Sequence, residues 1–380
     1  MTATATDPIA RLISFYQNPM SDALDASAAG VPVVGITSNT VPWELIAAAE
    51  MYPVVLRSED GATPFADEFM EPQIFQPRIR SIFDQIVSGR WPLRALIIPR
   101  TSEQEYKLFL YLREISRQHP DKALPPIYLY DLPHSRSEES RAYGLRVTVA
   151  LKEQLEAISG TSIAIDDIAV SIAESNAARA TVRSLGALRR GTPRISGCLA
   201  LSLIGPFWSI SRNKYSELAQ EAFANLRGLP ALSAPRVLVK GVSIDQSKLH
   251  ALLESFGALV VSEDDWWGER SAGQDISTIG DPVAACLEKY YSDSPSPRTF
   301  PGSVADSWFE NRSREGVEGV VFYLPEDDYI YGWDYPRQKK FLDVIGIPNV
   351  VIREDPRQIE MPERSRIQTW VQNLPKAPQS

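Results

Sequence analysis

The sequence predicts an α/β fold made of two doubly wound, flavodoxin-like lobes of parallel sheet, with a helical element between them. A pattern of apolar strand, polar loop, amphipathic helix and second strand recurs four times, and the four units fall into two pairs at about 31–131 and 235–353. Short apolar strands that alternate with helices are typical of βαβ units and a parallel sheet. Between the pairs, residues 136–230 show helical periodicity and no strand character.

The expected strands are short runs rich in Val, Ile and Leu, bounded by polar residues, Pro or Gly. They are expected at 32–37, 52–57, 94–99, 125–131, 236–241, 258–264, 319–324 and 347–355. The helices that join the two strands of each unit are expected at 42–51, 103–115, 246–257 and 335–346. Each has apolar residues at helical spacing, which suits a helix packed on one face of a sheet.

The segment between the two pairs carries two long helical runs, at 138–158 and 166–190. A linker rich in Gly, Pro and Ser at 228–235 then precedes the second group of strands. We therefore divide the chain into a first α/β lobe at 1–135, a mainly helical connecting region at 136–230, and a second α/β lobe with a C-terminal helix at 231–380.

Composition excludes several classes of function. The 380-residue chain has a net charge of −9, which argues against nucleic acid or an anionic membrane surface as its main partner. No apolar run approaches the ~20 residues needed to span a bilayer. The N-terminal segment lacks the basic start and apolar core of a signal peptide. These features predict a soluble, cytoplasmic protein.

The two cysteines, Cys198 and Cys286, are far apart in the sequence and lie in apolar, helix-like surroundings. Two thiols alone form neither a disulfide framework nor the ligand set of a four-iron cluster, so both are interpreted as buried apolar residues. The sequence also lacks HExxH, paired CxxC, the P-loop pattern and the GxSxG elbow. The familiar zinc, nucleotide and serine-hydrolase sites are therefore not expected.

The candidate site residues lie at or just after the ends of the predicted strands, because the loops after parallel strands open on one edge of the sheet, where ligands bind. The loops after the first strands of the units carry Ser38, Asn39, Thr40, Arg100, Thr101, Ser102, Ser243, Asp245, Glu326, Asp327 and Asp328. Two of the second strands end in Asp131, Pro133 and His134, and in Glu263, Asp264 and Asp265. Helix capping explains residues 38–40 about as well as ligand contact does. For 326–328 a solvated acidic loop, and for His134 an ordinary turn residue, are the simpler interpretations.

Two other features flank these loops. Pro42 suits the first turn of a helix, and Glu44 then lies where the helix dipole favours a carboxylate. Trp266 and Trp267 stand beside an acidic run, where they either line an apolar pocket or cover the core.

Several segments, in this order, resemble the 2-hydroxyacyl-CoA dehydratase and benzoyl-CoA reductase subunit family over about residues 30–375. The family's C-x-Y-x-P-E-E-L/I run is similar to S-N-T-V-P-W-E-L at 38–45, and its I-P-x-S/T-C-D run to I-P-R-T-S-E at 98–103. Its E-D-x-x-x-G-x-R run is similar to E-D-D-W-W-G-E-R at 263–270. The family's D-G-V-I, Y-P, P-C-P and T-R-x-x-A-F elements resemble 318–321, 335–336, 295–297 and 365–370.

The resemblance implies a cofactor that this chain is not equipped to hold. In the family, three loop cysteines bind a [4Fe–4S] cluster, and those cysteines align here with Ser38, Ser102 and Asp328. Other common cysteine positions align with Gln76 and Ser296. Clusters are held by soft thiolates, which serine hydroxyls and a carboxylate replace poorly. We therefore expect no cofactor in this chain, with a [4Fe–4S] cluster possible on a partner subunit.

The resemblance also implies partners. Family members work as paired, similar subunits with a separate ATP-dependent activator, so we expect either a heterodimer with a cluster-bearing homologue or a homodimer, acting on an acyl-CoA substrate. The first interpretation is a subunit that completes the acyl-CoA cleft of such a pair. The second is a standalone, non-radical hydratase, lyase or thioesterase for a CoA thioester. The third, ranked lowest, is a magnesium or manganese site at residues 326–328.

The expected residue roles follow from these interpretations. Catalytic roles are expected for Ser38, Glu44, Ser102 and Asp328. Substrate-binding roles are expected for Asn39, Thr40, His134, Glu263, Trp267 and Arg270. The phosphates of CoA require a local basic patch, for which the candidates are Arg78, Arg80, Arg100 and Arg270.

Overall fold

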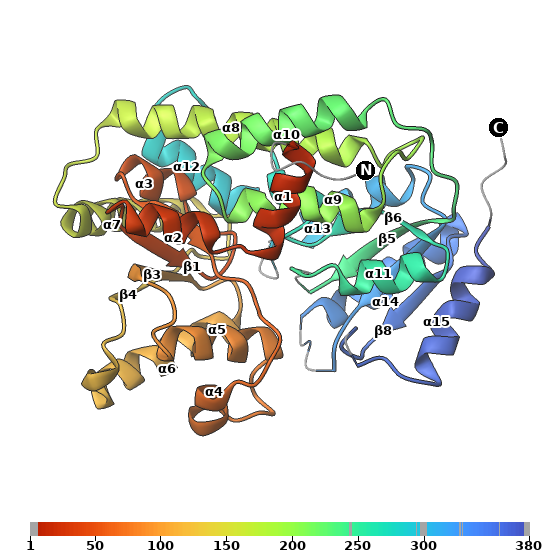
Figure 1. Cartoon of the computed structure of the whole chain (residues 1–380), viewed down its shortest axis with the longest axis horizontal. Coiled ribbons are helices and arrows are strands. Elements are labelled where there is room, and N and C mark those ends of the chain that lie inside the picture. The colour runs from red at the N-terminus through yellow and green to blue at the C-terminus, as the bar shows by residue number, and fades with distance from the viewer. Residues whose placement is uncertain are drawn as a thin grey trace.

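The computed structural model describes residues 7–242, 245–293, 295–296, 302–326, 328, 330–356 and 358–375. It contains two four-stranded sheets in which every strand pair is parallel. In Figure 1 the two sheets occupy opposite sides of the molecule, and a layer of helices runs above both of them. The predicted fold class, two doubly wound parallel-sheet lobes with a helical element, is confirmed.

The first sheet has the strand order β2-β1-β3-β4. Its strands are β1 (Val33–Ile36), β2 (Tyr52–Val55), β3 (Leu93–Pro99) and β4 (Ile127–Tyr130). The helices of this lobe are α3 (Trp43–Ala48), α4 (Pro64–Phe69), α5 (Pro77–Val87) and α6 (Glu103–Gln118), and a short 3-10 turn, η1 (Pro120–Lys122), follows α6. Most of β1 and β3 is buried on both faces, which is why these strands read as continuous apolar runs.

The second sheet repeats this plan with the order β6-β5-β7-β8. Its strands are β5 (Arg236–Gly241), β6 (Leu259–Asp264), β7 (Gly319–Tyr323) and β8 (Asn349–Ile352). The helices of this lobe are α11 (Lys248–Ser255), α13 (Gly302–Ser313), α14 (Tyr331–Ile345) and α15 (Glu363–Gln372), with the 3-10 turn η3 (Glu269–Ala272) after β6. All eight strands expected from the sequence are present.

The helical layer draws on more of the chain than the expected 136–230 region. From that region come α7 (Glu138–Ser159), α8 (Ile165–Ala187), α9 (Gly197–Ile204), the 3-10 turn η2 (Gly205–Trp208) and α10 (Arg212–Leu226). The N-terminal helix α1 (Pro8–Gln17) packs on α9 and α10, and α12 (Pro282–Ser292) packs on α7 and α8. The remaining helix, α2 (Ser21–Ala28), contacts β1 and β2.

This arrangement has a common cause. The outer surface of the first sheet has to be covered, and the apolar faces of α1, α3, α8, α9, α10 and α12 supply one continuous core with it. A second core lies on the other face of the first sheet, under α4, α5 and α6. The two faces of the second sheet carry their own cores.

Both strand orders reverse direction at one point, and this positions the site. In the first sheet the chain passes from β1 to β2 in one direction, and then from β2 across β1 to β3 in the other. In the second sheet it passes from β5 to β6, and then from β6 across β5 to β7. At such a switch point the loops after the two central strands diverge and leave a crevice at the carboxyl edge. The crevices therefore lie after β1 and β3 in one lobe and after β5 and β7 in the other.

In the part of the chain that the structure describes, no helix is both long enough and apolar enough to cross a membrane.

The close contact between α9 and β6 can be tested by adding a single methyl group at Gly197. Gly197 begins α9, and a Cβ atom placed on it would lie 2.6 Å from Val260 Cβ and 2.7 Å from the Val260 carbonyl oxygen on β6. Gly197→Ala should therefore push α9 off the second sheet and lower the free energy of unfolding by about 1–3 kcal/mol. Urea denaturation measures this. Gly228→Ala, where a Cβ meets nothing within 4 Å, is the matched control and should be close to neutral.

Candidate functional site

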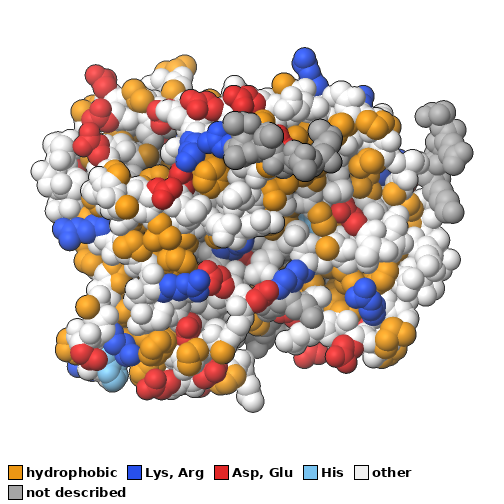
Figure 2. Space-filling view, in the orientation of Figure 1, with side chains coloured by type: hydrophobic (Ala, Val, Ile, Leu, Met, Phe, Trp, Pro, Cys, Tyr) orange, Lys and Arg blue, Asp and Glu red, His pale blue; other side chains and the backbone are white. Residues whose placement is uncertain are grey.

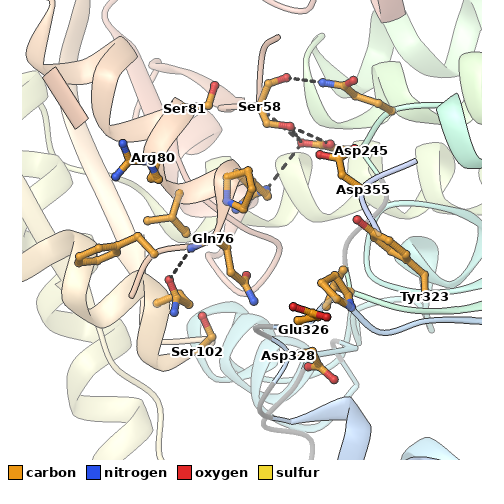
Figure 3. Close-up of a pocket in the computed structure, with 18 of the residues that line it drawn as sticks. Ser58, Gln76, Arg80, Ser81, Ser102, Asp245, Tyr323, Glu326, Asp328 and Asp355 are labelled. Atoms are coloured by element: carbon orange, nitrogen blue, oxygen red, sulfur yellow. Dashed lines mark hydrogen bonds and ion pairs between the residues drawn. The ribbon is translucent and has the colours of Figure 1, made fainter. Parts of the chain in front are cut away.

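A cleft of about 1210 Å³ separates the two lobes at the switch points of both sheets. On one wall lie residues that follow β2 and β3 and the first turns of α5 and α6. On the other wall lie residues that follow β5, β7 and β8. Figure 3 shows Gln76 and Ser102 of the first lobe facing Glu326 and Asp328 of the second. The cleft thus occupies the place where doubly wound sheets bind ligands.

Four side chains after β1 and β3 form a compact group, which we call the Glu105 cluster: Ser38, Thr101, Ser102 and Glu105. The Ser38 and Thr101 hydroxyl oxygens lie 2.5 Å apart, and the Ser102 hydroxyl donates to a Glu105 carboxyl oxygen at 2.8 Å. Thr101, Ser102 and Glu105 line the cleft, whereas Ser38 is fully buried behind Thr101. Ser102 is also the N-cap of α6, since its hydroxyl accepts the amide hydrogen of Glu105.

Glu105 is the member of this cluster that can hold a proton. Only 5% of the residue is exposed, and burial raises the pKa of its carboxyl. The Arg78 guanidinium and the hydroxyls of Ser102, Thr101 and Ser38 lower the pKa, but they do not cancel the effect of burial. The cluster therefore presents a carboxyl that stays protonated to higher pH than an ordinary glutamate.

Asp328 lies on the opposite wall, where it caps a helix. Its carboxylate accepts hydrogen bonds from the backbone amides of residues 330–332 at the start of α14. Glu326 lines the same wall, while Asp327 lies outside the described residues. Among the described residues, no group of three or more His, Cys, Asp or Glu side chains is arranged to hold a metal ion. The proposed hard-metal site at 326–328 thus gains no support from the described part of the loop.

Asp245 joins the two walls at one end of the cleft. Its carboxylate accepts hydrogen bonds from the Ser58 amide and hydroxyl, each at 3.0 Å, and lies 3.6 Å from Arg78 Nε. The neighbouring Gln246 donates to the Ser58 carbonyl at 3.0 Å. Figure 3 shows Ser58 and Asp245 meeting across the gap between the lobes. Ser243, expected beside Asp245, lies outside the described residues.

Glu44 is not brought to the cleft. It is fully buried, its carboxylate accepts from Arg179 Nη2 at 2.7 Å, and Tyr290 donates to it at 2.8 Å. Burial alone would raise the pKa of this carboxyl, but Arg179, Arg212 and Tyr290 outweigh it and the pKa is lowered. The structure therefore places Glu44 in an ion pair that ties α3 to α8 and α12, because its carboxylate needs a cation once it is buried.

Glu263 and Trp267 also lie in the interior rather than at the cleft. Glu263 is fully buried, pairs with Arg189 through both of its oxygens, and contacts His250 Nε2 at 2.9 Å. Trp267 is 1% exposed and packs against Trp208 and Trp266. These positions join the second sheet to the helical layer, so both residues are placed where they stabilise the fold.

The other expected substrate-binding residues are not part of the cleft lining. Asn39 is buried and donates to the Pro295 carbonyl at 2.8 Å, and Thr40 is buried beside it. Arg270 pairs with Asp264 and lines a separate cavity of about 270 Å³. His134 follows β4 and is half-buried.

The four arginines expected to bind CoA phosphates are already engaged. Arg78 donates to the Thr37 carbonyl at 2.6 Å, and Arg80 donates to the Met70 carbonyl at 3.0 Å and pairs with Asp67. Arg100 lies 3.3 Å from both Asp131 and Glu103, and Arg270 pairs with Asp264. Ion pairing of this kind leaves little net positive charge to attract a phosphate.

The cleft lining as a whole is acidic. Its described residues include eight carboxylates and five cations. The carboxylates belong to Glu59, Glu103, Glu105, Asp245, Glu326, Asp328, Glu354 and Asp355, and the cations to Arg78, Arg80, Lys107, Lys248 and Arg353. On the molecular face in Figure 2, acidic and basic side chains are interspersed rather than gathered into a basic patch.

The donors at the three loop positions do not fit a four-iron cluster. Ser38, Ser102 and Asp328 offer hydroxyl and carboxylate oxygens, whereas such clusters take thiolates. Cys198 lies in α9, where its thiol contacts the Ser247 carbonyl at 3.9 Å, and Cys286 lies in α12. Neither thiol is part of the cleft lining, and burial raises the pKa of both. Neither cysteine replaces the thiolates that the loop positions lack.

The sequence matches the family described as 2-hydroxyglutaryl-CoA dehydratase, D-component, over residues 38–374. The chain belongs to this family. It is 20% identical to the (R)-phenyllactyl-CoA dehydratase beta subunit of Clostridium sporogenes, covering 91% of this chain and 92% of the relative. It is 22% identical to the lactoyl-CoA dehydratase subunit beta of Anaerotignum propionicum, over 96% and 98% of the two chains.

A third relative is the (R)-2-hydroxyglutaryl-CoA dehydratase subunit beta of Acidaminococcus fermentans, 22% identical over 91% of this chain and 94% of the relative. The family recognised from the sequence motifs is therefore confirmed. At identities this low the family is established, but the role of an individual residue in this D-component relative has to be argued from its own surroundings.

Sequence reasoning named Ser38, Ser102 and Asp328 as neighbours. Ser102 and Asp328 do line one cleft, with Ser38 behind its wall. It missed Glu105, although one signal was present: Ser102-x-x-Glu105 is a helix-start pattern directly after a buried strand, which aims a carboxylate at the carboxyl edge of the sheet.

The Glu44–Arg179 pair predicts a pH-dependent loss of stability. Glu44→Gln leaves the Arg179 charge buried without its partner, and this should lower the free energy of unfolding by about 3–5 kcal/mol at neutral pH. Because the folded-state pKa of Glu44 is lowered, its contribution is present above the unfolded pKa of about 4.3 and is lost as the pH falls.

The difference in unfolding free energy between wild type and Glu44→Gln should accordingly shrink from pH 7 towards pH 3, as measured by urea denaturation. Glu153→Gln, on the exposed face of α7, is the control and should change stability little at any pH. A Glu44 variant as stable as wild type at pH 7 contradicts the assignment of this residue to an ion pair.

The contacts of Asp245 with the first lobe predict that its loss increases the separation of the two lobes. Asp245→Ala removes the acceptor for Ser58 and the carboxylate beside Arg78, so the two lobes should separate further on average. Small-angle X-ray scattering should show a larger radius of gyration, and limited proteolysis should be faster. Asp343→Ala, which breaks an exposed pair with Lys339 on α14, should change neither measurement.

Proposed function

We propose that this chain is a subunit of a 2-hydroxyacyl-CoA dehydratase-type complex that holds no iron–sulfur cluster of its own. In this proposal it completes an acyl-CoA cleft together with a homologous, cluster-bearing subunit. An ATP-dependent activator then acts on the complex through that partner. The chain itself contributes the cleft between its two lobes and the scaffold that positions it.

The observation that carries the proposal is the chemistry of the cleft. The family resemblance places cluster ligands at Ser102 and Asp328, and both residues line this cleft. Both side chains are engaged in helix capping instead. The thiols of the chain lie in helices α9 and α12. A cleft at the carboxyl edges of both sheets that carries no soft donors is suited to binding, with the redox step carried out elsewhere.

Two further facts support a shared cleft. The relatives named above are each called a beta subunit, a name that belongs to an enzyme with more than one kind of subunit. The described lining has more carboxylates than cations, which disfavours tight binding of the CoA phosphates by this chain alone. A partner that supplies cations for the nucleotide end removes this difficulty.

A second candidate is a standalone, non-radical enzyme that acts on a CoA thioester. The Glu105 cluster favours it, because a buried carboxyl in contact with hydroxyls can move a proton without any cofactor. We rank it second because the acidic lining offers no evident site for the phosphates of a free CoA ester.

The proposal is tested by purifying the chain together with the products of neighbouring genes under anaerobic conditions. We expect a cysteine-bearing homologue to co-purify, with iron and sulfide associated with that partner and none with this chain after reconstitution alone. The isolated chain should bind acyl-CoA weakly and turn it over at no measurable rate. A stoichiometric cluster on the isolated chain, or full turnover of a CoA thioester by it, contradicts the proposal.

A further inference from the structure

The floor of the cleft on the first-lobe side gathers hydrogen-bond donors around a buried carboxyl. Ser102 donates to Glu105 at 2.8 Å, and the Ser38 and Thr101 hydroxyls lie against each other at 2.5 Å. Only 5% of Glu105 is exposed, yet the residue lines the cleft. Because Thr101, Ser102 and Glu105 all line the cleft, the cluster is a candidate for ligand binding.

Arg78 on α5 completes the floor and sets the charge balance. Its Nη2 donates to the Thr37 and Leu56 carbonyls at 2.6 and 3.4 Å, and its Nε lies 3.6 Å from Asp245. These contacts fix the guanidinium at the ends of β1 and β2, while 16% of its side chain stays exposed in the cleft. Asp245 also lies beside this guanidinium, which is nevertheless the group that most lowers the pKa of Glu105.

In its protonated form the Glu105 carboxyl is a hydrogen-bond donor, as the Arg78 guanidinium is. Burial raises the pKa of Glu105, and Arg78 is the charged group whose field opposes that rise, together with the hydroxyls of Ser38, Thr101 and Ser102. The protonated carboxyl has one O–H to donate and the guanidinium has N–H groups. An uncharged acceptor suits this site better than an anion does, because the rest of the described lining is rich in carboxylates.

We propose that Glu105 and Arg78 bind the carbonyl oxygen of an acyl thioester at the floor of the cleft, with Glu105 donating a hydrogen bond as the neutral acid. The choice of a thioester rests on the proposed function. The site needs only the acyl end of the ligand and none of the phosphates of CoA. In this proposal the Glu105 cluster orients the substrate carbonyl by hydrogen bonding.

The test uses the full chain and a thioester without phosphates, the N-acetylcysteamine thioester of lactate, with binding followed by calorimetry or ligand NMR. Wild type should bind this probe at least as well as it binds lactoyl-CoA. Glu105→Ala and Arg78→Ala should each weaken binding by about tenfold or more, the size expected for loss of one hydrogen bond to a buried donor.

The pH dependence separates a donor from a merely structural residue. Wild-type affinity should fall as the pH rises through the raised pKa of Glu105, because the ionised carboxylate has no proton to donate and repels the carbonyl oxygen. Glu105→Gln, whose amide still donates at every pH, should bind the probe with an affinity that stays level. Glu153→Gln, on the exposed face of α7 and outside the cleft lining, is the matched control and should follow wild type.

Each contrary result is informative. No binding of the probe by wild type, wild-type affinity in Glu105→Ala, or the same pH profile in wild type and Glu105→Gln overturns the inference. If Glu105→Ala fails to fold, the comparison of wild type with Glu105→Gln decides alone. Failure to co-purify a cysteine-bearing homologue would overturn the proposed function while leaving this carbonyl site intact, so the two failures are distinguishable.

Discussion

The cleft depends on the contact between Asp245 and the opposite lobe. Each sheet is a complete four-stranded unit with cores on both faces, so neither needs the other to fold its strands. Asp245 accepts hydrogen bonds from Ser58 and lies beside Arg78, and these contacts hold the edges of the two sheets together as one site. Because that carboxylate is almost fully buried, its donors have to stay in place, and the two switch points remain face to face.

The helical layer provides the second connection between the lobes, and its polar contacts are buried ion pairs. Glu44 with Arg179 links α3 to α8, and Glu263 with Arg189 links β6 to the segment after α8. Removing one partner of such a pair leaves a buried charge, so these pairs tie the layer to both sheets strongly even though their net stabilisation is small. The rigid frame that results leaves the loops of the cleft free to vary in chemistry.

The loops after β3 and β7 lie at the cleft, where Ser102 and Asp328 use their oxygens to cap α6 and α14. Beside them, Glu105 and Arg78 offer donors to a neutral oxygen. The same scaffold can therefore hold a soft-metal site or a hydrogen-bonding site, depending on a few side chains at the ends of its strands.

The candidate site was only partly predictable from the sequence. Ser102 and Asp328 were found because each follows a strand and the carboxyl ends of parallel strands share an edge. Glu44 lies in the first turn of α3 and Glu263 near the end of β6, yet both are buried against arginines that lie more than 70 positions away in the chain. Glu105 was overlooked because a helix-start pattern says nothing about whether the carboxyl faces water or a cleft.

The sequence by itself determined the two parallel sheets, the helices between their strands and the family, because periodicity, strand length and motif order are local properties of the chain. Only the tertiary structure decided which carboxylates are ion-paired, which one has a raised pKa, and that α1 and α12 join the helical layer. The physical reason is that burial and the nearest charge set the state of an ionisable group, and both are fixed by residues distant in sequence.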